Sequence, residues 1–356
     1  MRNFPRTRDE LNGTYDQMAL LETVPLWEIY KNLVAREPNP VAQPWIWRYR
    51  DVRPLLLQAG ESIDADDAER RVMVLANPGL GKPTVTHTLI AGLQLVMPNE
   101  TAPCHRHTQS ALRFVLEGDS GYTAVNGERC TMERGDLILN PSWAWHDHVN
   151  TGNQPLIWLD GLDVPLTNFL GATFAEELGT RNQGIVQQPI DRADDESLST
   201  YGSGLVPTQA VPAAPGSASP VNRYPYGRAR EALTRLLDAG RIDESYGVRL
   251  AYVNPRSGSD VMPTLSAYLQ MLPAGFKGQP SRSTASFVFT VVEGEGTVTI
   301  GERRFEWAEN DVFVVPNWTA MYFESSHRSV LFSFSDAAAL KMLGLYREQC
   351  GNEISP

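Results

Sequence analysis

The chain has 356 residues, a net charge of −11 and a pI near 5.1. This length accommodates two domains with connecting segments, and 42% hydrophobic with 21% charged residues is typical of a globular protein. The acidic balance argues against nucleic acid or an anionic membrane as the main partner. We therefore expect no nucleic-acid partner and no membrane partner. An anionic small molecule is still compatible with this composition, because a few nearby arginines outweigh a distant net charge.

Targeting signals and cysteines give little sign of export. No apolar run approaches the roughly 20 residues that cross a bilayer, and the first residues have no signal-peptide stretch. Cys104, Cys130 and Cys350 are odd in number and form no CxxC pair. Free thiols in a reducing compartment explain them most simply, so we expect a cytoplasmic protein.

The N-terminal part has a helical pattern. Residues 7–36 place apolar side chains at helical spacing, which predicts one or two amphipathic helices. Pro38, Pro40 and Pro44 then stop helix formation. We assign residues 1–70 to an N-terminal helical arm.

Beyond the arm the pattern changes to short β-branched runs separated by turn residues, which is typical of a β-sandwich or barrel. Residues 203–225 are rich in Pro, Ala, Gly and Ser and are expected to form a linker with little structure. A helical stretch follows at 227–241. We therefore predict five parts: an arm (1–70), a metal-binding β domain (71–170), a linker with a helix (171–248), a metal-free β domain (249–335) and a C-terminal helix or tail (336–356).

The two strand-rich parts resemble each other. Residues 75–78 match 252–255, and GDLILNPSW at 135–143 matches NDVFVVPNW at 310–318. Such self-similarity is typical of an internal duplication. We expect two copies of one β fold.

Four of the six histidines form two H-x-H pairs, His105 with His107 and His146 with His148, all in the first copy. Residues two apart in a strand project to the same face, so each pair can direct both imidazoles into one interior. Three imidazoles with open positions are typical of a catalytic metal site. The other two histidines have no such neighbours and are expected to be structural.

The second copy serves as a control for this interpretation. It carries Ser281 and Ser283 where the first has His105 and His107, and Met321 falls opposite His146. Loss of all three together is expected if they act as one site. The second copy should therefore be metal-free and structural.

These segments resemble the cupin signature. His105 and His107 begin its first motif, and residues 135–150 carry its second motif with His146 at the ligand position. The glutamate that cupins often place four residues after the second histidine is replaced by Ala111. The resemblance implies an all-β dominated fold, a bicupin of two jelly-roll barrels with N-terminal and linker helices and a three-histidine metal site.

The segments at 77–81, 91–100, 104–118 and 140–148 resemble gentisate 1,2-dioxygenases and their relatives acting on salicylates and 1-hydroxy-2-naphthoate. The resemblance implies Fe(II), O2 and a small aromatic hydroxy acid, a 2-hydroxybenzoate that opens between the carbons bearing its carboxyl and hydroxyl groups. It also implies a homo-oligomer, a tetramer.

Carried over by position, His105, His107 and His146 resemble the iron ligands. Arg113 resembles the carboxylate-binding arginine; a strand continuing from His107 would place it on the ligand face. His148 resembles a histidine that bonds the substrate or relays a proton, and a role as a fourth metal ligand is the open alternative. Gln94 and Asp160 match family positions that line or support the site. For each of them, a purely structural hydrogen bond is the open alternative.

Two positions near residue 70 and one on a neighbouring strand bear on the substrate. Arg70 or Arg71 is expected to supply a second guanidinium, and the sequence does not distinguish between them. Gly92 shares a strand face with Ile90 and Gln94, and its small size is expected to leave room in the site. This hints at salicylate-type or bulkier rings, including 5-nitrosalicylate, beside gentisate.

Two other function classes compete with this one. A cupin enzyme using Mn, Ni or Zn for isomerisation or hydrolysis would use the same three histidines. A metal-assisted binding protein or sensor without turnover would also use them, although no DNA-binding motif or basic patch accompanies them.

Overall fold

The computed structural model describes residues 12–63, 68, 70–179, 186–203, 206–208, 217–351 and 354. The chain divides into two units, Met1–Asn39 and Pro40–Pro356. The first contains α1 (Asn12–Leu20) and α2 (Leu26–Leu33). Of the two, only α2 separates polar from apolar side chains, which agrees with the prediction of one or two amphipathic helices. The part of the predicted helical region before residue 12 lies outside the described residues.

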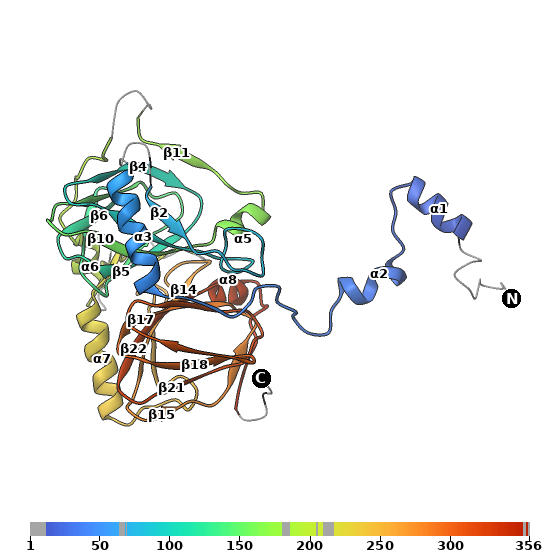
Figure 1. Cartoon of the computed structure of the whole chain (residues 1–356). Helices are drawn as coiled ribbons and strands as arrows, with labels where there is room; N and C mark the ends of the chain where they lie inside the picture. The colour runs from blue at the N-terminus through green and yellow to red at the C-terminus, as the bar shows by residue number, and fades with distance from the viewer. Residues whose placement is uncertain are drawn as a thin grey trace. The chain divides into compact units, whose positions relative to one another are not determined.

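The second unit is built from two antiparallel β-barrels, drawn in teal and green and in orange and red in Figure 1. The first barrel and the segments joined to it contain β2 (Val72–Val74), β3 (Ile90–Val96), β4 (Thr101–His107), β5 (Ala111–Glu117), β6 (Gly121–Val125), β7 (Glu128–Met132), β8 (Leu137–Asn140), β9 (His146–Asn150), β10 (Leu156–Leu162), α5 (Val164–Phe169), β11 (Ala175–Glu177), α6 (Glu196–Tyr201) and β12 (Arg223–Tyr224).

The second barrel follows α7 (Tyr226–Asp238), and two elements near the N-terminus, β1 (Trp45–Trp47) and α3 (Tyr49–Ser62), precede the first. The second barrel contains β13 (Val248–Ala251), β14 (Ser266–Leu272), β15 (Phe276–Lys277), β16 (Ser281–Ser283), β17 (Phe287–Glu293), β18 (Gly296–Ile300), β19 (Arg303–Trp307), β20 (Val312–Val315), β21 (Met321–Ser325), β22 (Ser329–Ser335), α8 (Ala337–Met342) and β23 (Glu348–Cys350).

Each barrel has two sheets. The first barrel pairs its strands in the orders β12-β8-β5-β10-β3-β2 and β11-β4-β9-β6-β7, and the second in the orders β1-β20-β17-β22-β14-β13 and β19-β18-β21-β16-β23, with β15 beside β21. The strands of one copy recur in the same order in the other, which confirms the predicted duplication and the bicupin fold.

Alternation along the strands creates three apolar cores. On β5, Leu112, Phe114 and Leu116 join residues of the second barrel in one large core, and Phe114 stacks on Phe332 with 4.0 Å between ring centroids. Val115, on the other face of β5, belongs to the core inside the first barrel. The sheet that contains β5 and the sheet that contains β17 thus pack against each other, and the opposite face of each sheet lines the interior of its own barrel.

The two copies exchange their leading strands. β1 precedes the first barrel but pairs with β20 of the second, whereas β12 precedes the second barrel but pairs with β8 of the first. The helix after each strand then packs on its own copy, α3 on β3 and α7 on β13 and β14 (Figure 1). Backbone amides extend the exchange: Tyr49 N–H donates to Asp311 and Tyr226 N–H donates to Asp136.

Each of these helices is anchored by one carboxylate on its own barrel. Glu117 accepts hydrogen bonds from Tyr49 Oη at 2.7 Å and from Arg53 Nε and Nη2 at 2.6 and 2.8 Å. In the second copy, Glu293 accepts the corresponding bonds from the tyrosine and arginine of α7. The two copies therefore share this arginine–glutamate ion pair as well as the same strand order.

Several boundaries predicted from the sequence need adjustment. The predicted arm, 1–70, includes α3, which lies in the second unit and continues through Pro54. The predicted linker, 171–248, contributes β11 and β12 to sheets of the first barrel. Parts of the Pro-rich stretch, 204–205 and 209–216, lie outside the described residues. No helix in the part of the chain that the structure describes is long and apolar enough to span a bilayer.

Candidate active site

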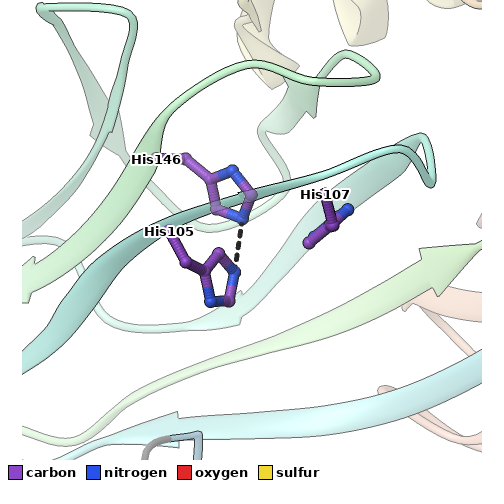
Figure 2. A group of neighbouring side chains, drawn as sticks. All are labelled: His105, His107 and His146. Carbon is purple, nitrogen blue, oxygen red and sulfur yellow. Dashed lines mark hydrogen bonds between the residues drawn. The ribbon is translucent and has the colours of Figure 1, made fainter. Parts of the chain in front are cut away.

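The interior of the first barrel brings together His105 and His107 from β4 and His146 from β9. His105 and His146 are direct partners in the β4–β9 register, and their Nε2 atoms lie 2.9 Å apart. One ring nitrogen from each of the three histidines lies within 4.8 Å of the others. Figure 2 shows the rings of His105 and His146 facing each other and His107 beside them.

Backbone carbonyls orient two of these rings. His107 Nδ1–H donates to the Gln109 carbonyl and His146 Nδ1–H donates to the Ala144 carbonyl, each at 2.9 Å. The Nε2 atoms of both rings are therefore unprotonated, which is the form that binds a metal. His105 takes the other tautomer, because its Nδ1 faces Arg70 Nη2 at 3.3 Å and its Nε2–H donates to His146.

The environment keeps the triad neutral. Burial, followed by the charges of nearby Arg70, lowers the pKa of His105 to about 2, and burial lowers the pKa of His107 to about 4. Burial also lowers the pKa of His146 well below its usual value. Neutral imidazole is the ligand form of histidine, so at neutral pH the cluster is ready to bind a metal.

The spacing of two of the donors, on His105 and His146, fits a shared ion. Two nitrogens each about 2.1 Å from one metal and at a right angle to each other lie about 3.0 Å apart. The 2.9 Å between His105 and His146 Nε2 matches this value. For His105 Nε2 to be a ligand, its proton would have to leave that atom, because only an unprotonated ring nitrogen binds a metal. The set of three imidazoles suits iron among other transition metals.

Arg113 lies on β5, directly opposite Asp160 on β10. Arg113 Nε is 3.4 Å from Asp160 Oδ1, and both side chains are almost fully buried. Asp160 Oδ1 accepts a hydrogen bond from Trp158 Nε1 at 2.9 Å, whereas Arg113 Nε and Nη1 are buried without a hydrogen-bond partner. Arg113 thus presents unused N–H groups inside the barrel.

The structure brings Arg113 to the histidines by a different route from the predicted one. A continuous strand from His107 was expected, but β4 ends at His107, residues 108–110 connect, and β5 begins at Ala111 in the other sheet. Arg113 faces the interior because it alternates with Leu112 and Phe114, which pack between the barrels. The parity argument through one strand was therefore wrong.

His148 and Gln94 also expose unused polar atoms to this interior. His148 Nδ1 is 2.9 Å from Thr123 Oγ1, while its Nε2 is buried without a partner. Gln94 is 2% exposed, and its Nε2 has no hydrogen-bond partner. Buried polar groups are nearly always satisfied. Their convergence beside the triad therefore indicates a site for a polar ligand.

The structure separates the two arginines near position 70. Arg71 donates to both carboxylate oxygens of Glu100, at 2.8 and 2.9 Å. Arg70 instead donates to the Pro103 carbonyl and approaches His105. Burial, followed by the charge of Arg113, lowers the pKa of Arg70 to about 10. Arg70 is therefore the arginine near the histidine cluster.

Gly92 does not leave open space, contrary to expectation. A Cβ atom at this position would lie 2.6 Å from Cγ1 of Val72 on the neighbouring strand β2. Glycine is needed here because β2 approaches β3 closely. The predicted room at this position is already filled by Val72.

Sequence reasoning missed Asn140, which is fully buried at the end of β8. Neither atom of its amide has a hydrogen-bond partner, and the residue opposes Ala111 on β5. It shares a face of β8 with Ile138, which belongs to the core inside the first barrel. The second copy carries Val315 here, so the contrast between repeats was the available signal.

A second missed feature clamps the ligand strand. The Arg106 guanidinium lies 4.5 Å from the ring centroids of both Trp143 and Trp145 and donates to Glu176 on β11. Trp143 has a φ of 65°, unusual for a large side chain. Its N–H donates to the His107 carbonyl at 2.7 Å. The clamp thus holds both edges of β4 around its histidines.

The second barrel repeats this frame without the histidines. Ser281 and Met321 are register partners, as His105 and His146 are in the first barrel. Arg282 lies over Trp318, whose N–H donates to the Ser283 carbonyl. The alignment of the repeats is therefore confirmed at the level of strand pairing.

Comparison with known proteins agrees with this architecture. Residues 92–162 match the family model described as a cupin domain. The chain is 43% identical over 345 residues to gentisate 1,2 dioxygenase 1 of Aquipseudomonas alcaligenes, covering 97% of both chains. The chain belongs to the gentisate 1,2-dioxygenase family. It is therefore an aromatic ring-cleaving dioxygenase with a metal cofactor.

Other members of this family are named for different substrates. The chain is 36% identical to a 5-aminosalicylate 1,2-dioxygenase of a Comamonas species, covering 96% of this chain and 90% of the relative. A salicylate 1,2-dioxygenase from Pseudoaminobacter salicylatoxidans, solved in adducts with gentisate, superposes with a TM-score of 0.87 at 34% identity, covering 98% and 95% of the two chains. The names of these relatives thus refer to several different 2-hydroxybenzoates.

Proposed function

We propose that the chain is an Fe(II)-dependent 1,2-dioxygenase that opens a 2-hydroxybenzoate between its carboxyl- and hydroxyl-bearing carbons. Candidate substrates are gentisate, salicylate and 5-substituted salicylates, including 5-nitrosalicylate. The observation that carries the proposal is the convergence of three neutral imidazoles with the unused N–H groups of Arg113 in one interior. Both atoms of O2 enter the product, and the ring carbon–carbon bond is broken.

His105, His107 and His146 would hold the iron through their ring nitrogens. Fe(II), when bound, supplies the redox chemistry that lets O2 react with the ring and offers open positions to the substrate's carboxylate and hydroxyl oxygens. The fourth cupin position is Ala111, so no carboxylate from that position competes for these sites. The relatives' names support ring cleavage, whereas the identity of the metal rests on the donor set and the resemblance.

Arg113 would bind the substrate carboxylate. Its planar fork matches a carboxylate, and its Nε and Nη1 atoms have no hydrogen-bond partner in the protein. Asp160 positions the guanidinium from across the strand pair, and Arg70 adds positive potential. Gln94 Nε2 supplies a further donor to the bound acid.

His148 would hold or transfer a proton at Nε2. Thr123 contacts the opposite ring nitrogen and orients the ring, so Nε2 remains free toward the interior. Burial lowers the pKa of His148 well below its usual value, so the neutral ring accepts a proton only when the reaction develops one. We also infer a cytoplasmic homo-oligomer, a tetramer by resemblance, with its cysteines as free thiols.

The test is anaerobic reconstitution with Fe(II), followed by O2 uptake and ultraviolet detection of the ring-opened product. The panel contains gentisate, salicylate, 5-aminosalicylate, 5-nitrosalicylate and 1-hydroxy-2-naphthoate. One O2 consumed per acid with at least one of these is the expected result. Absence of uptake with all of them, or oxygen-independent turnover with Zn, Mn or Ni alone, would overturn the proposal.

A further inference from the structure

The second barrel lacks the three histidines and has Phe289 at the position of Arg113, but it keeps polar side chains at the positions of Gln94 and Asp160. Gln270 repeats Gln94: Gln94 opposes Trp158 in the β3–β10 pair, and Gln270 opposes Leu331 in the β14–β22 pair. By the same registers, Ser333 takes the place of Asp160. Arg249 on β13 lies directly opposite Gln270.

These side chains face the interior of the second barrel. On β14, Leu269 and Met271 pack in the core between the barrels. Their neighbours Tyr268 and Gln270 therefore project to the other face, where Leu272 belongs to the internal core. The same alternation on β22 directs Ser333 inward.

The polar atoms of this cluster are buried and unsatisfied. Gln270 is 1% exposed and neither of its amide atoms has a hydrogen-bond partner, and the Ser333 hydroxyl is in the same condition. Arg249 contributes two more buried donors, Nε and Nη2. A buried polar group that is left unpaired destabilises the fold. In the first barrel, unpaired atoms of Gln94 and Arg113 mark the candidate substrate site in the same way.

Arg249 carries a positive charge among aromatic rings. Its guanidinium lies 4.0 Å from the ring centroid of Tyr268, 4.4 Å from that of Tyr246 and 5.1 Å from that of Phe287. Among the described residues no carboxylate forms an ion pair with it. Glu348 is engaged by Tyr246, whose hydroxyl donates to Oε1 at 2.9 Å. Rings offset part of the charge, but a planar guanidinium with unused donors still favours an anion.

We propose that the second barrel binds a small carboxylate, held by Arg249 and completed by the amide of Gln270 and the hydroxyl of Ser333. A carboxylate matches the two parallel N–H groups of a guanidinium, and the Gln270 amide and Ser333 hydroxyl donate to its remaining lone pairs. The rings of Tyr246, Tyr268 and Phe287 give this site an aromatic wall suited to a planar acid. The arginine of this site comes from β13, not from the strand that corresponds to β5, so the second barrel would bind an acid by its own arrangement and without metal chemistry.

The experiment is calorimetric titration of the metal-loaded full chain under nitrogen, with benzoate and acetate as separate probes. We expect two benzoate sites per chain. Arg249→Gln should weaken one of them at least tenfold and leave the other, whereas Arg113→Gln should do the reverse. Arg282→Gln is the matched control, because Arg282 also stacks on an aromatic ring of the second barrel, at 4.6 Å, but donates to Gln349 outside the interior.

Gln270→Leu preserves the shape of the interior and provides a second test if Arg249→Gln does not fold by circular dichroism. It should weaken the same site at least tenfold. A single benzoate per chain that depends on Arg113 alone, or a second site indifferent to both Arg249→Gln and Gln270→Leu, would overturn the proposal and leave water as the occupant. Acetate binding at the Arg249 site indicates that the carboxylate suffices, and benzoate alone indicates that the rings contribute. Failure of ring cleavage would leave this second site intact, so the two proposals fail independently.

Discussion

Arg113→Gln separates substrate binding from stability, because the same guanidinium faces a buried carboxylate and the proposed substrate. Arg113 and Asp160 are 3% and 4% exposed, and Nε and Oδ1 lie 3.4 Å apart. Removing one member of a buried pair costs about 3–5 kcal/mol in unfolding free energy. Losing the partner of a bound carboxylate costs about 2–5 kcal/mol of binding, or roughly 30- to 5000-fold in KM.

The double variant Arg113→Gln/Asp160→Asn distinguishes the two effects. An asparagine at 160 keeps an acceptor for Trp158 Nε1 but carries no charge, so the double variant should recover most of the unfolding free energy. It should not recover KM, because the cation is still missing. The measurements are urea unfolding and steady-state O2 uptake across acid concentrations.

The pH dependence of the stability loss provides a further check. Burial raises the pKa of Asp160, and Arg113 partly opposes the rise. In Arg113→Gln that opposition is gone, so the folded pKa lies further above the unfolded value of about 3.9. The unpaired charge destabilises the fold above the folded pKa, and the deficit should shrink as pH falls through it. An unchanged KM in Arg113→Gln, or a restored KM in the double variant, would refute the reasoning.

Three further predictions concern the metal and the frame. His107→Ala should abolish bound iron and O2 uptake, as measured by metal analysis and an oxygen electrode; full iron content would contradict the proposed ligand set. Arg106→Ala should weaken Fe(II) affinity roughly 10- to 100-fold because it releases the ligand strand, whereas Arg282→Ala, which removes the corresponding stack in the second barrel, should leave Fe(II) affinity unchanged. Burial raises the pKa of Glu117, but hydrogen bonds from its arginine and tyrosine partners outweigh the effect of burial and hold the pKa below its usual value. Glu117→Gln should therefore lose about 1 kcal/mol of unfolding free energy at pH 7. The difference from the unmodified protein should vanish as the pH falls below about 4. Glu293→Gln should behave alike, and a pH-independent loss would contradict the linkage.

The duplication and the histidine cluster could be predicted because each leaves a local pattern. Short β-branched runs repeat in both halves, and the H-x-H spacing alone places His105 and His107 on one face. The second cupin motif indicated His146 as the third member, and the comparison of the halves, which places Met321 opposite it, served as a control. Strand pairing in the structure agrees with this alignment.

Other features depend on contacts that leave no local pattern. β1, β11, β12 and β23 have two or three residues each, too few for alternation to appear. Arg70 and Arg71 are adjacent in the sequence, and their roles differ only because Glu100 lies beside Arg71 and His105 lies beside Arg70. Strand β2 lies over Gly92 through tertiary packing, which the composition of its own strand does not reveal.

Because the two copies exchange strands, each copy needs a strand from the other to complete one of its sheets. A fragment ending after β10 would lose β12 from the sheet that carries Arg113, and a fragment beginning at β13 would lose β1 from its counterpart. Deleting the second half would therefore expose the apolar surface around Phe114 as well as unpaired strand edges. Selection for an intact histidine-bearing half therefore also preserves the strands and the inter-barrel core that the second half contributes.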